Sequence, residues 1–217
     1  MKLSPRLTAI SQIFMDQKDQ NNHYDLFVDT CCDHGLLGFH LAKKISESRI
    51  LLVDIVPNII NLIQQKIKMT EIKNIQSMVM DARELILPSH QTILLFIAGV
   101  GGELAAEIIE KILLNNPESS LDFVVTPNNK SYLVRDKLKS MDYKSLREEL
   151  VFDRKHGYEI IFSSKKNGIP FDRIGKKIFN LKNENHKNYL DEMRRHYLLK
   201  STHSSLYQEI YSEYKYL

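Results

Sequence analysis

The feature that most constrains the fold is a series of short, almost wholly apolar runs between residues 25 and 163. Three of them are Leu26-Phe27-Val28, Ile50-Leu51-Leu52-Val53 and Ile93-Leu94-Leu95-Phe96-Ile97. Strands without alternating polar residues leave no face for water, so they belong in a parallel sheet that helices cover on both faces. The sequence therefore predicts an α/β fold.

Stretches with helical periodicity alternate with these runs. We expect strands at Asp25–Asp29, Arg49–Asp54, Ile75–Met80, Thr92–Ala98 and Leu121–Thr126. We expect helices at Leu36–Ser46, Pro57–Met69, Gly102–Leu114 and Ser131–Met141. Such alternation gives βαβ units with right-handed crossovers.

The last part of the series departs from this alternation. Residues Tyr143–Arg154 and Tyr158–Ser163 are both rich in strand formers, and only Lys155-His156-Gly157 separates them. A link this short permits only a hairpin, so the final strand must run antiparallel. A mostly parallel seven-stranded sheet with an antiparallel last strand is typical of class I, Rossmann-like methyltransferases. A dinucleotide-dependent dehydrogenase more often continues with parallel units.

Shorter segments flank this core. Within residues 1–24 we expect a helix at Pro5–Met15 and a polar loop at Gln17–Asn22. We interpret residues 165–170 as a linker. Residues 171–217 have the spacing of an amphipathic helix or a helical hairpin, too short to fold without leaning on the body or on a partner. We therefore expect one domain over residues 1–164 and a helical extension over residues 165–217.

Composition narrows the setting of the protein. With 43% hydrophobic and 26% charged residues, the chain resembles an ordinary soluble protein, and no apolar run approaches the roughly 18–20 residues that span a bilayer. The start lacks the apolar stretch of a signal peptide. The two cysteines, Cys31 and Cys32, are adjacent and offer neither a disulfide framework nor a zinc site. These features predict a cytoplasmic protein without metal; a monomer is favoured.

Charge is unevenly distributed along the chain. The net charge is +3, yet residues 165–217 carry eleven basic and six acidic side chains, a net of +5, which leaves −2 for residues 1–164. A basic extension on a near-neutral body suits contact with a polyanion. A solvated helix surface explains the same composition equally well.

Acidic residues follow the first three predicted strands. Asp29, Asp54 and Asp81 stand about one βα unit apart, at the sheet edge where open α/β sheets bind ligands. Asp54 suits the two hydroxyls of a ribose, because one carboxylate offers two acceptor oxygens. Asp81, with Ala82 beside it, suits an adenine amino group. A single strand-end Asp often only caps the next helix, but three in register favour a nucleoside pocket.

The turn after the first strand, Asp29-Thr30-Cys31-Cys32-Asp33-His34-Gly35, separates the candidate cofactors. It lacks the Gly-x-Gly-x-x-Gly pattern that closes on a pyrophosphate, and Asp33 would repel one. A carboxylate there favours the sulfonium or amino group of S-adenosylmethionine. Cys31 and Cys32 are interpreted as small buried thiols rather than as a nucleophile pair.

A second glycine-containing turn follows the fourth predicted strand. Ala98-Gly99-Val100-Gly101-Gly102 lets backbone approach a flat ligand, although a tight strand-to-helix turn would need only one of these glycines. After the fifth strand, Asn128 is placed to bond a base edge; equally, Asn128 or Asn129 caps the helix that starts near Ser131.

Several of these motifs occur together in a known family. Leu3-Ser4-x-Arg6-Leu7, Asp29-x-x-x-Asp33-His34, Ile97-Ala98-Gly99-x-Gly101-Gly102, Pro127-Asn128 and Gly157-Tyr158-Glu159-Ile160-Ile161 follow the order seen in the TrmK family. The chain thus resembles, over residues 3–163, bacterial tRNA (adenine-N1)-methyltransferases that act on adenosine 22. These enzymes also carry a C-terminal helical extension.

The sequence departs from the family pattern in its first turn. The family usually has Asp-Ile-Gly-Ser-Asp-His-Ala, so Cys31 stands where a glycine lets the cofactor lie close. Val100 replaces a usual Met, and Thr126 replaces a Gln before the Pro-Asn pair. These changes are typical of a divergent branch.

The resemblance and the strand-end pattern together imply a set of site residues. The expected catalytic residues are Asp33 and His34, with a structural hydrogen bond as the favoured role for His34. S-adenosylmethionine is expected to contact Asp29, Cys31, Asp33, Gly35, Asp54, Asp81, Ala82, Ala98 and Gly99. A tRNA substrate is expected to contact Arg6, Gly101, Gly102, Asn128, Lys176, Lys177, Arg194 and Arg195. The alternatives are a small-molecule methyltransferase and a catalytically silent RNA-binding relative whose pocket Cys31 has spoiled.

Overall fold

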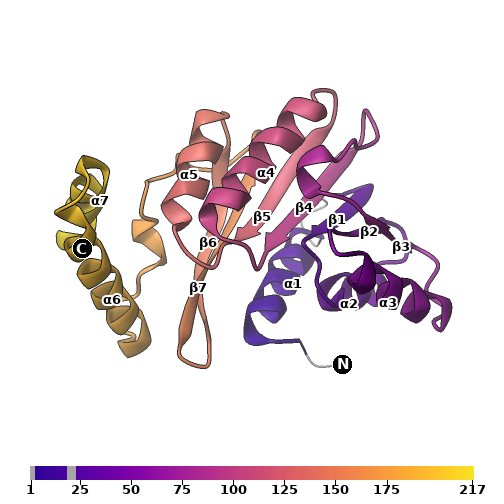
Figure 1. Cartoon of the computed structure of the whole chain (residues 1–217), viewed down its shortest axis with the longest axis horizontal. Helices are drawn as coiled ribbons and strands as arrows, with labels where there is room; N and C mark the ends of the chain where they lie inside the picture. The colour runs from indigo at the N-terminus through magenta and orange to yellow at the C-terminus, as the bar shows by residue number, and fades with distance from the viewer. Residues whose placement is uncertain (1–2, 19–22) are drawn as a thin grey trace.

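The computed structural model describes residues 3–18 and 23–217. In that part of the chain, one seven-stranded sheet has the order β3-β2-β1-β4-β5-β7-β6 (Figure 1). Its strands are β1 (Leu26–Thr30), β2 (Arg49–Asp54), β3 (Ile75–Val79), β4 (Thr92–Ala98), β5 (Ser120–Thr126), β6 (Lys144–Asp153) and β7 (His156–Ser164). Pairing is parallel from β3 to β5 and antiparallel on both sides of β7. The predicted sheet, with its antiparallel last strand, is confirmed.

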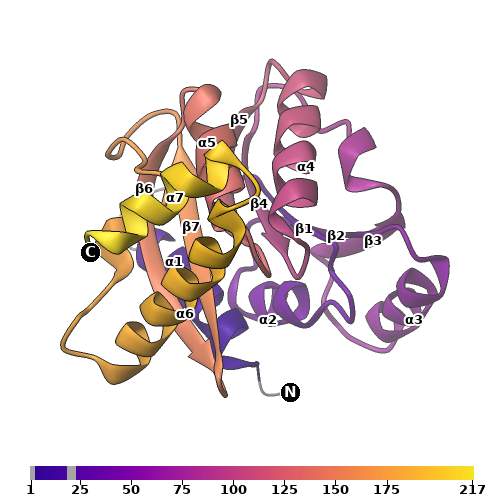
Figure 2. The same cartoon turned by 60° about the vertical axis from the view of Figure 1, so that its left-hand side comes forward.

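Helices cover both faces of the sheet (Figures 1 and 2). One face carries α1 (Pro5–Lys18), α2 (Leu36–Lys44) and α3 (Pro57–Lys68); the other carries α4 (Gly102–Asn115), α5 (Ser131–Ser140) and the short 3-10 helix η1 (Ala82–Glu84). Successive side chains of the central strands enter the two cores in turn. Phe27 and Phe96 pack under α1 and α2, whereas Val28 and Leu95 pack under α4. This double burial is why the central strands have no polar face.

The β6–β7 hairpin is tighter than the sequence suggested. Phe152 pairs with Gly157 and Asp153 with His156, so only residues 154–155 connect the strands. Arg154 adopts a positive φ of 57°, the left-handed conformation that two-residue hairpins need to match strand twist. A left-handed residue leaves no mark in the pattern of apolar side chains. The connection was therefore predicted one to two residues too late in the sequence.

The C-terminal extension forms a helical hairpin against the body. It contains the 3-10 helix η2 (Lys176–Ile178), α6 (Glu184–Ser201) and α7 (Ser205–Lys215), with an irregular segment before α6. A third buried apolar cluster joins the extension to α5. It contains Leu190, Tyr197, Ile210 and Tyr214 of the extension and Tyr132 of α5. The helical hairpin is therefore correct for residues 184–215, and the extension leans on α5.

Two shorter expectations need correction. The polar loop expected at Gln17–Asn22 begins inside α1, which continues to Lys18, and residues 19–22 lie outside the described residues. The expected linker at 165–170 also holds structure, because Ile169 exchanges two backbone hydrogen bonds with Ser145 at the edge of β6. The first difference arises because α1 continues through Gln17 and Lys18. The second arises because the outer edge of β6 offers backbone groups that Ile169 can pair with.

A buried arginine fixes the junction between body and extension. Arg135 of α5 is fully buried; its Nε donates to Glu148 over 2.6 Å and its Nη1 lies 2.7 Å from Glu159. Tyr189 of α6 donates its hydroxyl to the other oxygen of Glu159 over 2.8 Å. Gly175 passes so close that a Cβ there would lie 2.2 Å from Arg135, so the extension fits only with glycine at this point.

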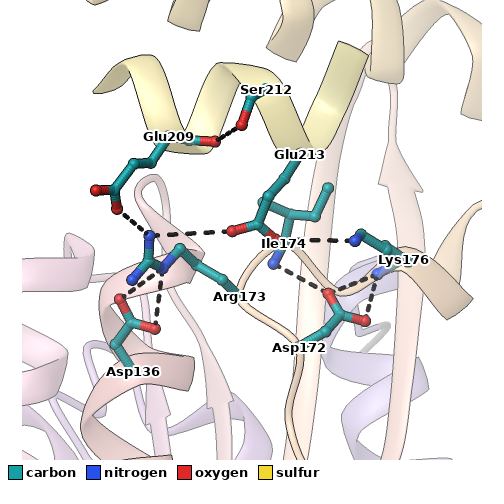
Figure 3. A network of polar contacts seen from close by, with 8 residues as sticks. All are labelled: Asp136, Asp172, Arg173, Ile174, Lys176, Glu209, Ser212 and Glu213. Carbon is teal, nitrogen blue, oxygen red and sulfur yellow. Dashed lines mark hydrogen bonds and ion pairs between the residues drawn. The ribbon is translucent and has the colours of Figure 1, made fainter. Parts of the chain in front are cut away.

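A second, partly exposed network ties α7 to α5 (Figure 3). Arg173 lies between them, with Nε 3.2 Å from Asp136 and Nη1 3.0 Å from Glu209 and 3.9 Å from Glu213. Lys176 lies 4.0 Å from Glu213 in the same network. Two charge networks and an apolar cluster therefore set the position of the extension.

Candidate active site

The carboxyl ends of β1, β2 and β3 lie side by side, because parallel pairing aligns Thr30 with Val53 and Asp54 with Val79. The Asp54 carboxylate is nearly buried there. One of its oxygens accepts the Asp33 N–H over 3.1 Å and the other accepts the Val56 N–H over 3.0 Å. An ionised carboxylate has about four acceptor sites, so each oxygen can still receive a hydroxyl.

The turn after β1 contains three residues in the left-handed region. The φ angles are 55° at Cys31, 48° at Asp33 and 67° at Gly35. Only glycine adopts this conformation freely; a side-chain-bearing residue pays roughly 1–2 kcal/mol for it. Cys31 thus occupies a conformation that glycine adopts freely, at the position where the family resemblance led us to expect glycine.

Asp29 lies behind this turn rather than at its surface. Its side chain is buried in β1, and burial raises its pKa to about 7, with the negative charge of Asp54 acting in the same direction and a hydrogen bond with the Gly38 backbone opposing it. Asp29 therefore changes charge near neutral pH, directly beneath the turn.

A cavity of about 240 Å³ opens between the ends of β1, β2 and β3 and the start of α4; we call it the cofactor cavity. Four of the sequence-predicted cofactor residues line it: Cys31, Asp54, Asp81 and Ala82. The remaining lining is mostly apolar, and sequence reasoning missed it: Ile55, Met80, Val100, Leu104 and Ile108, together with the cation Arg83. Ile55 and Leu104 are among the exposed large apolar side chains, a surface property that only the fold reveals.

The protonation states of two side chains that line the cofactor cavity, Cys31 and Asp81, are set by their surroundings. Burial, with the charge of Asp54 next, raises the pKa of the Cys31 thiol to about 11, so the sulfur stays protonated and is a poor nucleophile. Arg83 donates from Nε to Oδ1 and from Nη2 to Oδ2 of Asp81, and this bidentate contact holds the pKa of that carboxyl below its usual value. Asp81 therefore presents a fixed, ionised acceptor.

Asp33 and His34 lie in the exposed turn after β1. Their side chains are 72% and 70% exposed, and the His34 Nε2 is 3.6 Å from the Asp33 carboxylate. His34 borders a separate hollow formed with α3 rather than the cofactor cavity. The two residues predicted to be catalytic therefore expose their side chains to solvent, and neither lines the cofactor cavity.

The Ala98–Gly102 turn is hydrogen-bonded to the segment between β5 and α5. Gly99 has a φ of 82° and an open face, since an added Cβ would meet no atom within 4 Å. Gly102 lies so close that a Cβ would be 2.4 Å from the Lys130 carbonyl. Asn128 donates its amide to the Gly99 carbonyl over 2.7 Å, and its backbone N–H to Val100 over 2.8 Å. The structure thus joins the two segments that the sequence assigned to the substrate.

Arg6, in the N-terminal helix α1, contacts Asn128 beside this turn. Its Nη1 donates to the Asn128 side-chain oxygen over 3.3 Å, and its guanidinium carbon lies 4.6 Å from the centre of the Tyr158 ring. Arg6 and Asn128 were predicted from the sequence as substrate residues. Tyr158 was not assigned a role, because its position beside them depends on the β6–β7 hairpin.

A cleft of about 580 Å³ lies between the body and α6. Its basic lining residues come from the start of α5, the hairpin and α6: Lys130, Lys155, His156, His196 and Lys200. Tyrosines lie between them: Tyr158, Tyr189, Tyr197 and Tyr214. Lys130 is paired with Glu103. Glu159 and Glu192 also line the cleft, and the buried Glu159 is held by Arg135.

The four basic residues predicted in the extension lie outside the lining of this cleft. Arg194 is half-buried and donates to the Tyr214 carbonyl over 3.1 Å, and Lys176 belongs to the Arg173 network. Lys177 and Arg195 are exposed and form no ion pair with any described residue. Charge count alone could not separate the cleft-facing cations from these, because their direction depends on how α6 docks.

Within residues 3–18 and 23–217, no helix has the length and apolarity to cross a membrane. Over the same described ranges, no three His, Cys, Asp or Glu side chains gather as metal ligands would.

Comparison with known protein families agrees with the geometry. A family model described as a methyltransferase domain matches residues 3–161. The chain belongs to this methyltransferase-domain family. The match includes the three strand-end aspartates, the turn after β1 and the Ala98–Gly102 turn. No curated protein matches the chain in sequence.

Solved structures share the fold. TrmK of M. capricolum, solved with S-adenosyl-homocysteine, is 17% identical, with a TM-score of 0.70 over 99% of this chain and 94% of its own. The B. subtilis M1A22 tRNA methyltransferase TrmK is 17% identical, with a TM-score of 0.69 over 99% and 94%. Magnesium protoporphyrin IX methyltransferase of Synechocystis PCC 6803, solved with bound SAM, is 16% identical, with a TM-score of 0.60 over 74% and 78%. At sequence identities this low, the similarity to these structures shows a shared fold and no more.

Proposed function

We propose that the protein is an S-adenosylmethionine-dependent methyltransferase that modifies N1 of an adenosine in tRNA, at position 22 by its resemblance to TrmK. The observation that carries this proposal is the shared extension. The two TrmK structures align over 99% of this chain, which must include residues 165–217, whereas the protoporphyrin methyltransferase aligns over 74%. An extension that forms one wall of a basic cleft suits a macromolecular anion rather than a small molecule.

The cofactor cavity fits the adenosine part of S-adenosylmethionine. Asp54 offers two held acceptor oxygens to the ribose, Asp81 offers an ionised acceptor to the adenine amino group, and the apolar wall suits a flat base. Asp29, Asp33 and Gly35 would surround the methionine part, with Ala98 and Gly99 on the side of the acceptor. When bound, this cofactor supplies an electrophilic methyl group.

The residues of the chain position the acceptor rather than activate it. Adenine N1 already has a free lone pair, so its attack needs no strong base, and in-line alignment and exclusion of water supply the acceleration. Gly99, Gly101 and Gly102 would form the acceptor wall. Asp33 and His34 lie in the turn after β1, and a hydrogen bond between them would order this turn.

The cleft would hold the RNA backbone. Lys155 and Lys200 line it beside the partly exposed Tyr158, and cations next to an accessible aromatic ring suit single-stranded or unstacked nucleotides. This assigns phosphate contacts to the cleft cations and a lesser role to Lys177 and Arg195 on outer surfaces. We further propose that residues 1–164 form the catalytic domain and residues 165–217 the RNA-binding extension, acting as a monomer without metal in the cytoplasm, where tRNA is modified.

Two binding titrations test this proposal. Calorimetry with S-adenosylmethionine should give saturable heat, and affinity for an unmodified tRNA transcript should fall by orders of magnitude between about 50 and 200 mM salt. Cofactor binding with no salt-dependent tRNA binding would instead favour a small-molecule methyltransferase. Binding of tRNA with no cofactor heat at high protein concentration would favour a catalytically silent RNA-binding relative.

A further inference from the structure

Three residues from distant parts of the chain meet at the inner end of the cleft. Arg6 comes from the first turn of α1, Asn128 from the end of β5 and Tyr158 from β7. The Arg6 guanidinium lies over the Tyr158 ring, 4.6 Å from its centre, while Nη1 donates to the Asn128 side-chain oxygen over 3.3 Å. Arg6 and Tyr158 are both only partly buried, and Tyr158 lines the cleft.

This group lies between the two sites described above. Tyr158 and Asn128 line the cleft, and Asn128 also bonds the carbonyls of Gly99 and Val100. Val100 in turn lines the cofactor cavity. A continuous series of direct contacts therefore leads from the Tyr158 ring to the wall of the cofactor cavity. Tyr158 therefore stands at the cleft end of this series of contacts, and Val100 at its cofactor-cavity end.

The Arg6–Tyr158 contact resembles the contact that a base would make. Proteins that bind unpaired nucleotides stack the bases on aromatic rings or on guanidinium planes. A base stacked on an exposed aromatic ring generally contributes more to binding than a cation held over such a ring. An incoming base can therefore displace Arg6 from the ring, and the released guanidinium can move to an RNA phosphate.

Asn128 gives this arrangement a preference for adenine. Its amide group donates to Gly99, which turns its oxygen toward Arg6. Once Arg6 leaves, this oxygen is an acceptor for the exocyclic amino group of adenine; guanine presents a carbonyl at the corresponding position, which would oppose it. Adenine N1 stays free for the methyl group, because Asn128 uses only the neighbouring amine.

We infer that Tyr158 is the platform on which the target adenine stacks after it leaves the RNA helix, and that Arg6 occupies this platform while no RNA is bound. This inference rests on the proposed function, and it assigns a substrate-binding role to a residue that sequence motifs left without one. The alternative is that Arg6 and Tyr158 only anchor α1 to β7.

Kinetics of paired variants separate the two. Tyr158→Phe keeps an aromatic ring, and Tyr158→Met replaces it with a flexible apolar chain. We expect Tyr158→Phe to retain kcat/KM for tRNA within about twofold, and Tyr158→Met to lose about 5- to 150-fold, the equivalent of one stacked base. Affinity for S-adenosylmethionine should be unchanged in both. An anchor alone would show as a lowered melting temperature in Tyr158→Met, with methylation retained below that temperature.

A cross-linking experiment on wild-type protein needs no variant to fold. A transcript with 8-azidoadenosine at the target position should, on irradiation, label Tyr158 or Arg6, as peptide mass spectrometry would show. Labelling elsewhere only, or full activity of Tyr158→Met, would overturn the platform while leaving methylation of tRNA intact. Absence of any methyl transfer by the wild-type protein would overturn the proposed function, and the platform with it.

Discussion

The backbone N–H of Asp33 donates a 3.1 Å hydrogen bond to the carboxylate of Asp54. This contact joins the turn after β1 to the end of β2, two places that lie about one βα unit apart in the sequence. Together with the Val56 N–H on its other oxygen, it fixes the Asp54 carboxylate before a ligand arrives. Preorganisation of this kind lowers the ordering cost of binding.

Replacement of Asp54 by Asn should weaken S-adenosylmethionine binding by about 10- to 100-fold, because an amide removes one of two charged acceptors. Calorimetry would measure the change. Asp25→Asn is the matched control: Asp25 accepts the Thr92 N–H over 2.8 Å at the opposite end of β1, far from the cofactor cavity. Equal losses in the two variants would contradict the assignment of Asp54 to the ribose.

Cys31→Gly should strengthen cofactor binding. Glycine adopts a φ of 55° freely and removes a side chain that lines the cofactor cavity, whereas the folding free energy should change little because glycine also gains freedom in the unfolded chain. Cys32→Ala serves as the comparison, since Cys32 lies outside the lining of the cavity. Unchanged or weaker affinity in Cys31→Gly would show that the thiol contributes to the site.

The charge of Asp29 should make stability depend on pH. Its pKa is raised from 3.8 to about 7, chiefly by burial, so the folded protein retains a proton that the unfolded chain releases. The resulting stabilisation is complete below pH 3.8 and is lost as pH rises through 7, at a rate of up to about 1.4 kcal/mol per pH unit. Urea unfolding at pH 5 and pH 8 should show Asp29→Asn gaining stability relative to wild type at the higher pH. Parallel profiles for the two proteins would refute this.

Arg135 and Arg173 both tie the extension to the body, but their removal should differ in cost. Arg135→Met leaves Glu148 and Glu159 as uncompensated buried carboxylates, and we expect a loss of about 3–5 kcal/mol in unfolding free energy. Arg173→Met removes partly exposed pairs, for which about 1 kcal/mol or less is typical. Urea denaturation would compare them, and similar losses would mean that Arg135 is not effectively buried.

The cleft cations should dominate the salt dependence of tRNA binding. A Lys155→Gln/Lys200→Gln double variant should reduce the slope of log affinity against log salt by about two, because each lysine contributes roughly one released counterion. Lys177→Gln/Arg195→Gln removes equal charge from outer surfaces and should change the slope much less. A larger effect of the outer pair would place the RNA on the far side of α6.

The sheet and its strand-end acids could be predicted because they depend on local pattern. Apolar runs such as Ile93–Ile97 indicate double burial, and the spacing of Asp29, Asp54 and Asp81 reflects the length of a βα unit. The structure nevertheless separates these acids: Asp54 and Asp81 line the cofactor cavity, whereas Asp29 is buried behind it. The spacing of these residues along the sequence does not show how deeply each side chain is buried.

The cleft could not be predicted, because tertiary docking creates it. Lys155, Tyr158 and Lys200 come together only when the β6–β7 hairpin meets α6. Arg135 reads in sequence as an ordinary basic residue of an amphipathic helix, yet it is fully buried between two glutamates. Such contacts join residues far apart in the chain and leave no periodic signal.

The central claim is methyl transfer to N1 of one adenosine in tRNA. Wild-type protein would be incubated with labelled S-adenosylmethionine and an unmodified tRNA transcript, and the digested nucleosides identified by mass spectrometry. The account predicts label in 1-methyladenosine from adenosine 22, and none in a matched transcript with guanosine at that position. Label in another nucleoside, equal label in the substituted transcript, or no transfer would contradict it.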